Sequence, residues 1–185
     1  MRSHPNTLLE RSQAYVVGSQ QAYALEKRVP WGISESSCYD FDDAGNYKYH
    51  AFGVPTVAIH KADFNRLVIS PYSTVLALNT DPIGAIANLH RMYDLGWFGA
   101  YGFYESADFS RGKRLLRAPS FQLVHCWMAH HQGMSLLSLA NFLSDNIVQR
   151  WFHSDRRVQA TELLLHEKPV AHVSSEDLAP GHAAA

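Results

Sequence analysis

The chain has 185 residues, which fits one large domain or part of a larger one, and 46% of them are apolar, enough for a sizeable core. Sixteen Lys and Arg residues face seventeen Asp and Glu residues. This balance leaves no basic excess to neutralise phosphates, so it argues against a nucleic-acid partner. Two cysteines are too few for a disulfide framework, and we expect a reducing compartment.

The composition is poor in charge and rich in rings. Charged residues make up 18% and aromatic residues 12%, and there are eleven histidines. This mixture suits a carbohydrate site, where sugar faces stack on rings and hydroxyls need polar partners, or a buried interface. The most apolar stretch, residues 121–143, contains three histidines and makes a poor membrane span. The first residues show no apolar signal region, and we expect neither a signal peptide nor a membrane segment in this chain.

The first predicted element is a helix over residues 6–28, capped by Asn6 or Thr7 and stopped by Pro30. A long aromatic stretch follows over residues 31–69. It includes a strand-like piece at 56–59 and an extended segment in which Tyr47 and Tyr49 share one face. A loop of this length is usually functional when it is ordered.

The second half is predicted to be mainly helical. A short helix covers residues 72–78, and Asp81 caps a helix that begins at Pro82 and stops at Gly96. Further helices are expected over residues 124–143, 146–152 and 156–167, with an irregular tail beyond them. The pattern therefore predicts a helical scaffold whose long loops form a pocket.

Two loop glutamates form the first candidate site. Glu35 follows Trp31 and Gly32, and Glu105 follows Tyr101, so each lies in an aromatic loop. Glycoside chemistry uses two carboxyl groups, one of which protonates the leaving oxygen while the other attacks the sugar or activates water. The alternative is a pair of unrelated glutamates that accept backbone hydrogen bonds.

The second candidate is the segment His130-His131-Gln132 in the predicted helix 124–143. Adjacent side chains on a helix point about 100° apart, so the two histidines are poorly placed to hold one metal ion. A histidine here could instead bind sugar hydroxyls, orient a carboxylate or simply lie in the core. We predict no metal ion and no cofactor.

A third, weaker pattern places Asp40, Asp42 and Asp43 shortly before Asn46. The spacing resembles part of a calcium loop but lacks the closing glutamate. An Asp-x-Asp motif of the kind found in glycosyltransferases is the other interpretation.

Several motifs follow one another along the chain. They are Pro-Trp-Gly-Ile-Ser-Glu-Ser from Pro30, Tyr-Lys-Tyr from Tyr47, Tyr-Gly-Phe-Tyr-Glu from Tyr101 and Met-Ala-His-His-Gln-Gly-Met-Ser from Met128. In this order they resemble one family, the glucoamylase-like domain of bacterial cyclic β-1,2-glucan synthases. The resemblance implies an all-α fold, a partial (α/α)6 toroid with about half of the helices, long aromatic loops and little strand. It assigns residues 1–168 to the C-terminal part of the domain and 169–185 to a tail or linker toward a following domain.

The resemblance also implies a function. It points to retaining transglycosylation that cyclises linear β-1,2-glucan, with Glu35 and Glu105 as the catalytic pair. Sugar-binding residues would be Trp31, Tyr49, Tyr72, Tyr101, Tyr104, His130, His131 and Gln132.

Two other functions stay open, an inverting endo-β-1,2-glucanase and a non-catalytic glucan-binding or scaffolding fragment. The implied partners are a β-1,2-glucan and the remaining domains of a larger synthase. The implied location is cytoplasmic, with the parent protein at the bacterial inner membrane.

Overall fold

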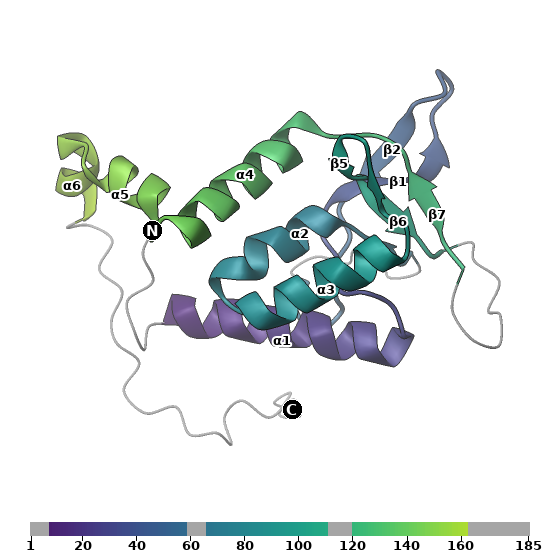
Figure 1. Ribbon diagram of the computed structural model, residues 1–185, viewed down its shortest axis with the longest axis horizontal. Coiled ribbons are helices and arrows are strands. Elements are labelled where there is room, and N and C mark those ends of the chain that lie inside the picture. Colours follow the sequence, from purple (N-terminus) through teal and green to yellow (C-terminus); the bar gives the residue numbers. More distant parts are fainter. Residues whose placement is uncertain (1–7, 59–65, 111–119, 163–185) are drawn as a thin grey trace, which may run out of the picture.

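Figure 1 shows the computed structural model, which describes residues 8–58, 66–110 and 120–162. Helices make up 51% of the described residues. The helices are α1 (Leu8–Lys27), α2 (Pro71–Leu76), the 3-10 helix η1 (Ala77–Asn79), α3 (Pro82–Asp94), α4 (Ala129–Leu143), α5 (Ile147–His153) and α6 (Arg156–Glu162). The strands are β1 (Ser36–Phe41), β2 (Tyr47–His50), β3 (Val68–Ile69), β4 (Phe98–Gly99), β5 (Gly102–Phe103), β6 (Ser106–Asp108) and β7 (Gln122–Val124).

The first helix is confirmed, although its predicted caps lie outside the described residues. It ends before Pro30, because Arg28 adopts a left-handed conformation with φ of 60°. The amide of Val29 then donates to the carbonyl of Ala24 at 3.0 Å, and that of Arg28 to Leu25 at 3.2 Å. This is the Schellman arrangement that satisfies the last carbonyls of a helix.

The predicted starts of α2 and α3 are confirmed as well. Pro71 opens α2, and the Asp81 carboxylate accepts a 3.0 Å bond from the amide of Gly84 in the first turn of α3. Gln21 of α1 donates to the same carboxylate at 2.7 Å, so the cap also joins α1 to α3. Gly96, with φ of 81°, follows the end of α3.

The helix expected over residues 124–143 begins only at Ala129. Residues 122–124 form β7 instead, paired antiparallel with β6 so that Val124 faces Ser106. The amide of Glu105 continues this pairing with a 3.0 Å bond to the carbonyl of Cys126. Of the predicted helix, Val124 therefore lies in the sheet and residues 125–128 form an irregular connection, whereas residues 129–143 are helical as predicted.

The chain has more strand than an all-α fold allows. One three-stranded antiparallel sheet has the order β3-β6-β7, and two hairpins are formed by β1-β2 and β4-β5. The extended segment at Tyr47–Tyr49 is confirmed as part of β2, whereas residues 56–57 of the strand-like piece at 56–59 lie in a turn. The helix-rich scaffold is confirmed, and the toroid stays a prediction.

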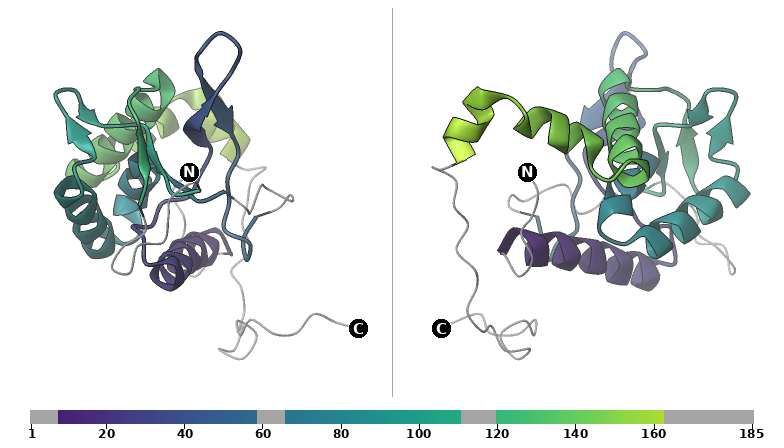
Figure 2. Two further views of the ribbon diagram at one scale, coloured as in Figure 1. Left: turned by 90° about the vertical axis from the view of Figure 1, so that its right-hand side faces the viewer. Right: turned by 60° about the vertical axis from the view of Figure 1, so that its left-hand side comes forward.

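The core lies between α1, the α2-α3 pair and the three-stranded sheet (Figures 1 and 2). Its largest fully buried side chain is Trp97, which contacts the rings of Phe109 and Phe121. Helix α4 packs against α2, where Ser138 donates to the carbonyl of Val75 at 2.9 Å. Helices α5 and α6 continue from α4 away from this core. Among the described residues, none of the helices has the length and apolar character to cross a bilayer.

Candidate active site

The loop that leads to Glu35 is held by two side-chain amides. Asn88 of α3 accepts from the amide of Trp31 at 3.1 Å and donates to its carbonyl at 2.8 Å. Gln20 of α1 does the same for Ile33, at 2.8 and 2.7 Å. Each carboxamide thus bonds the amide and the carbonyl of one loop residue, as a neighbouring β-strand would. The backbone hydrogen-bonding groups of the loop are satisfied in this way although no strand pairs with it. The result is a fixed approach to Glu35.

Gly32 lies between these two anchored residues and has φ of 129°. A Cβ atom here would lie 2.7 Å from the Ser73 hydroxyl oxygen, 2.9 Å from that of Thr74 and 3.0 Å from the carbonyl oxygen of Ser70. The position therefore requires glycine for its backbone conformation and for the close approach of α2.

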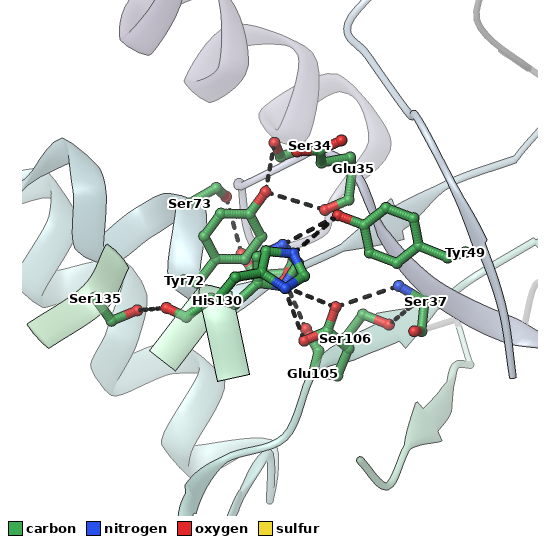
Figure 3. Close-up of polar contacts among 12 residues, drawn as sticks. Ser34, Glu35, Ser37, Tyr49, Tyr72, Ser73, Glu105, Ser106, His130 and Ser135 are labelled. Atoms are coloured by element: carbon green, nitrogen blue, oxygen red, sulfur yellow. Dashed lines mark hydrogen bonds and ion pairs between the residues drawn. The ribbon is translucent and has the colours of Figure 1, made fainter. Parts of the chain in front are cut away.

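The carboxylate of Glu105 is buried, with 1% of its side chain exposed. It accepts from the amide of Ser37 at 3.2 Å, and Nδ1 of His131 lies 2.9 and 3.0 Å from its two oxygens. Ser37 is only two residues beyond Glu35, so this contact joins the segment that carries Glu35 to Glu105, which is 70 residues further along the sequence (Figure 3). Ser70 donates to the carbonyl of Glu105 at 2.6 Å and fixes its backbone.

A chain of hydrogen bonds extends from Glu105 to the molecular surface. Nδ1 of His131 faces the two Glu105 oxygens, and Nε2 on the other side of the ring faces Tyr49. The hydroxyl of Tyr49, from β2, lies 3.2 Å from this Nε2 and 3.3 Å from Nε2 of His130. The Tyr72 ring stacks on His131 with centroids 3.7 Å apart and an interplanar angle of 10°. His131 is therefore held on three sides.

The charges of both glutamates contribute to raised pKa values of the same two tyrosines, Tyr49 and Tyr72. Burial and the charges of Glu35, Tyr72 and Glu105 raise the pKa of Tyr49 to about 12. Burial raises the pKa of Tyr72 as well, and the charges of Glu35 and Glu105 add to the shift although a hydrogen bond to Ser34 opposes it. The Tyr72 hydroxyl donates toward the Ser34 hydroxyl at 2.8 Å and the Glu35 carbonyl at 3.0 Å. Glu35 is exposed, in contrast to Glu105.

A second buried carboxylate shows what a purely structural role looks like. Asp108 of β6 accepts from the amide of Tyr39 at 3.0 Å, just as Glu105 accepts from Ser37. The Ser106 hydroxyl donates to the carbonyl of Ser37 at 2.5 Å. Side chains from β6 and the residue before it thus join β1 to the three-stranded sheet. Glu105 differs from Asp108 in its contact with His131.

The predicted sugar-binding residues divide into three groups. His131 contacts Glu105, and Tyr49, Tyr72 and His130 lie against His131 (Figure 3). Tyr101 and Tyr104 lie in a separate aromatic cluster with Trp127, at centroid distances of 5.4 and 5.3 Å. Trp31 packs in the core at 9% exposure, and Gln132 is exposed on α4.

Sequence reasoning missed the residues that hold the loop. Asn88 could have been found, because it lies between Ala85 and Met92 on the buried face of α3, where a polar side chain needs a partner. Gln20 gave no such signal, since polar residues surround it in the sequence. Trp127 was also missed, although it directly precedes the histidine motif.

The aspartate pattern is accounted for by the β1-β2 hairpin. Asp42 accepts from the amides of Ala44 and Asn46 at 3.0 and 2.8 Å, which is the geometry of a side chain that stabilises a tight turn. Asp40 instead pairs with Arg66 at 3.0 Å. In the parts of the chain that the structure describes, His, Cys, Asp and Glu do not form a group of three that could hold a metal ion.

Comparison with known proteins identifies the family. Residues 5–156 match the Glycoamylase family, described as "Putative glucoamylase". The chain belongs to this family. It is 36% identical over 168 residues to the cyclic β-(1,2)-glucan synthase NdvB of Rhizobium meliloti, a match that covers 91% of this chain and 6% of that protein. The resemblance drawn from the motifs is thus confirmed.

Solved structures of this fold are also similar. A glucoamylase-like protein of Bacteroides fragilis, itself described as putative, matches with a TM-score of 0.57 at 20% identity, over 86% of this chain and 34% of that one. An endo-β-1,2-glucanase of Chitinophaga pinensis, solved with sophorotriose and glucose, matches with a TM-score of 0.52 at 20% identity, over 82% and 32%. The chain therefore spans about a third of these structures and a small part of the synthase.

Proposed function

We propose that this Glycoamylase-family chain is part of a carbohydrate-active domain that processes β-1,2-glucan, with Glu35 and Glu105 as its catalytic carboxyl groups. The observation that carries this proposal is the bond from the Ser37 amide to Glu105, because Ser37 is only two residues beyond Glu35. The choice of β-1,2-glucan as substrate is supported by the similarity to a cyclic β-(1,2)-glucan synthase and to an endo-β-1,2-glucanase. Because the match covers only 6% of the synthase, we propose that the domain is part of a larger parent protein. We place that protein at the inner membrane, with this domain on the cytoplasmic side.

The finer proposal is retaining transglycosylation. The exposed Glu35 would protonate the glycosidic oxygen while a Glu105 oxygen attacks the anomeric carbon, which forms a glycosyl ester and releases the other part of the chain. Glu35, now a carboxylate, would take the proton from a hydroxyl at the far end of the bound glucan. That oxygen would attack the anomeric carbon and release Glu105, so the product is a ring and the configuration is retained.

The buried position of Glu105 sets a condition on this reaction. With 1% of the side chain exposed, one of its oxygens must become accessible before it can attack. His131 contacts Glu105 and the partly exposed Tyr49 contacts His131, so we propose that a shift of the Tyr49 ring opens a path to the carboxylate. His131 would act as a positioning residue, which holds the Glu105 oxygens through Nδ1.

The test is product analysis after incubation with linear β-1,2-glucan. We expect wild-type protein to give rings that are one water lighter than a linear chain of the same number of glucose units, together with the released part of the chain, and we expect no rings from Glu35→Gln or Glu105→Gln. Asp108→Asn is the matched control, because Asp108 also accepts from β1 but does not contact His131. Equal loss of activity in folded Asp108→Asn and Glu105→Gln would contradict a catalytic role for Glu105.

The second candidate is inverting hydrolysis, favoured by the similarity to a solved endo-β-1,2-glucanase. Here Glu105 would activate water instead of attacking the sugar, and this requires the two carboxyl groups to lie about 6.5–9.5 Å apart. Linear products of inverted configuration, detected by NMR of the fresh anomers, would favour this mechanism. Glucan binding without any product would identify a non-catalytic fragment.

A further inference from the structure

The β1-β2 hairpin has one aromatic face. Its register pairs Ser37 with Tyr49 and Phe41 with Tyr47, with an irregularity between the two pairs. The Phe41 and Tyr47 rings lie 4.9 Å apart, and Tyr39 contacts both, at 5.4 and 6.1 Å. Because paired residues share a face of the hairpin, these rings lie on the side that carries Tyr49.

The opposite face is ionic. Asp40 accepts from Arg66 at 3.0 Å and lies 3.6 Å from the Lys48 ammonium group. Arg66 also reaches the Cys38 sulfur at 3.2 Å, and Cys38 is buried. The two faces thus differ, with rings on one side and Cys38, Asp40 and Lys48 on the other. The Asp40–Arg66 pair joins this face to the segment before β3, whereas the rings of the aromatic face contact one another.

The aromatic face remains accessible and continues into the active site. Phe41 is 43% exposed and Tyr49 is 38% exposed, and the hairpin projects beyond the three-stranded sheet (Figures 1 and 2). At its inner end, the Tyr49 hydroxyl contacts the two histidines beside Glu105. At its outer end are Phe41, Tyr47 and the turn at Asp42. Rings therefore lead outward from the proposed catalytic carboxylate.

We propose that the face formed by Tyr39, Phe41 and Tyr47 binds glucose units of a β-linked glucan chain outside the catalytic centre. The apolar faces of pyranose rings pack on flat aromatic rings, and phenol hydroxyls can bond sugar hydroxyls at the edges. This composition of two tyrosines and one phenylalanine suits a sugar better than a wholly apolar partner. The inference rests on the proposed function, and it adds a preference for long chains over short ones.

The test compares the affinity for short β-1,2-linked oligosaccharides of a few glucose units with that for chains several times longer. We expect wild-type protein to bind the long chains more tightly, and Phe41→Ala and Tyr47→Ala to weaken long-chain binding about tenfold without changing short-chain binding. Phe41→Trp keeps a flat ring and is expected to retain long-chain affinity, whereas Phe41→Leu keeps only the apolar bulk and is expected to lose it.

Two controls separate this inference from general effects. Lys48→Ala lies on the ionic face of the same hairpin, and Trp151→Ala removes an exposed ring on α5, so both are expected to bind like the wild type. Equal affinity of the wild type for long and short chains, no binding of any chain, or equal losses in Lys48→Ala and Phe41→Ala would overturn the inference. Long-chain binding that depends on Phe41 but yields no product would instead count against the catalytic proposal alone.

Discussion

Replacement of Gly32 by alanine tests how the loop before Glu35 is fixed. The new Cβ would meet the hydroxyl oxygens of Ser73 and Thr74 and the carbonyl oxygen of Ser70, all within 3.0 Å. These atoms cannot move freely. The Ser73 hydroxyl donates to the carbonyl of Ser70 at 2.9 Å, and the Thr74 hydroxyl donates to the carbonyl of Trp31 at 3.1 Å. The amide of Ser70 also donates to the Gly32 carbonyl at 2.8 Å.

The expected cost has two parts. A non-glycine residue at this positive φ loses about 1–3 kcal/mol in backbone strain. Insertion of a methyl group into the packed contact with α2 adds about 1–3 kcal/mol. We therefore expect Gly32→Ala to lower the free energy of unfolding by roughly 2–6 kcal/mol. Because Glu35 is three residues away, glucan turnover should fall along with stability.

Chemical denaturation monitored by circular dichroism measures the loss, and Gly45→Ala is the control. Gly45 also has a positive φ, 81°, but a Cβ there would have nothing within 4 Å. We therefore expect Gly45→Ala to lose only the backbone part of the stability, about 1–2 kcal/mol, with no steric part. If both variants lose the same amount, the contact with α2 contributes nothing and our account of the loop is refuted.

Three further predictions concern single side chains. Asn88→Ala leaves the Trp31 amide without its acceptor, and we expect a loss of about 1–3 kcal/mol in denaturant unfolding. Tyr49 has a pKa raised to about 12, so its contribution to stability is complete below pH 10 and is lost as the pH rises toward 12. Ultraviolet titration should show a phenolate that forms near pH 12 and is missing in Tyr49→Phe, while the late titration of Tyr72 remains. Asp81 has a lowered pKa, chiefly because the Gly84 amide donates to its carboxylate. The stability that it contributes should therefore be present above pH 4 and lost in more acid solution. Asp81→Ala should lower the free energy of unfolding by about 1 kcal/mol. Thermal melts of this variant should show a weaker fall in stability at acid pH than those of the wild type.

The elements that could be predicted from the sequence are those with local signals. Asp81-Pro82 and Gly96 mark the two ends of α3, and both ends were found where the structure has them. Residues 122–124 carried no local signal that distinguishes strand from helix, because an apolar run fits either. Their strand state depends on pairing with β6, a contact across the chain that no local pattern contains.

The same limit applies to the site. The aromatic loops and the paired glutamates were visible in the sequence, since carboxyl groups beside rings are a recognisable pattern. The sequence could not show that Glu105 is buried while Glu35 is exposed, because burial depends on where His131 and β1 lie. The amide clamps of Gln20 and Asn88 were equally invisible, as they act on the backbone 13 and 57 residues away.

The proposed chemistry requires that β1 remain in place when Glu105 loses its charge. A glycosyl ester on Glu105 would be a weaker acceptor than the carboxylate, so the bonds from Ser37 and His131 would weaken during the reaction. Two contacts remain unaffected, from the Ser106 hydroxyl to the carbonyl of Ser37 and from the Tyr39 amide to Asp108. These contacts hold β1 on both sides of the reacting group. For the same reason Glu105→Gln, which keeps an amide oxygen for Ser37, should lose catalysis while it retains the fold.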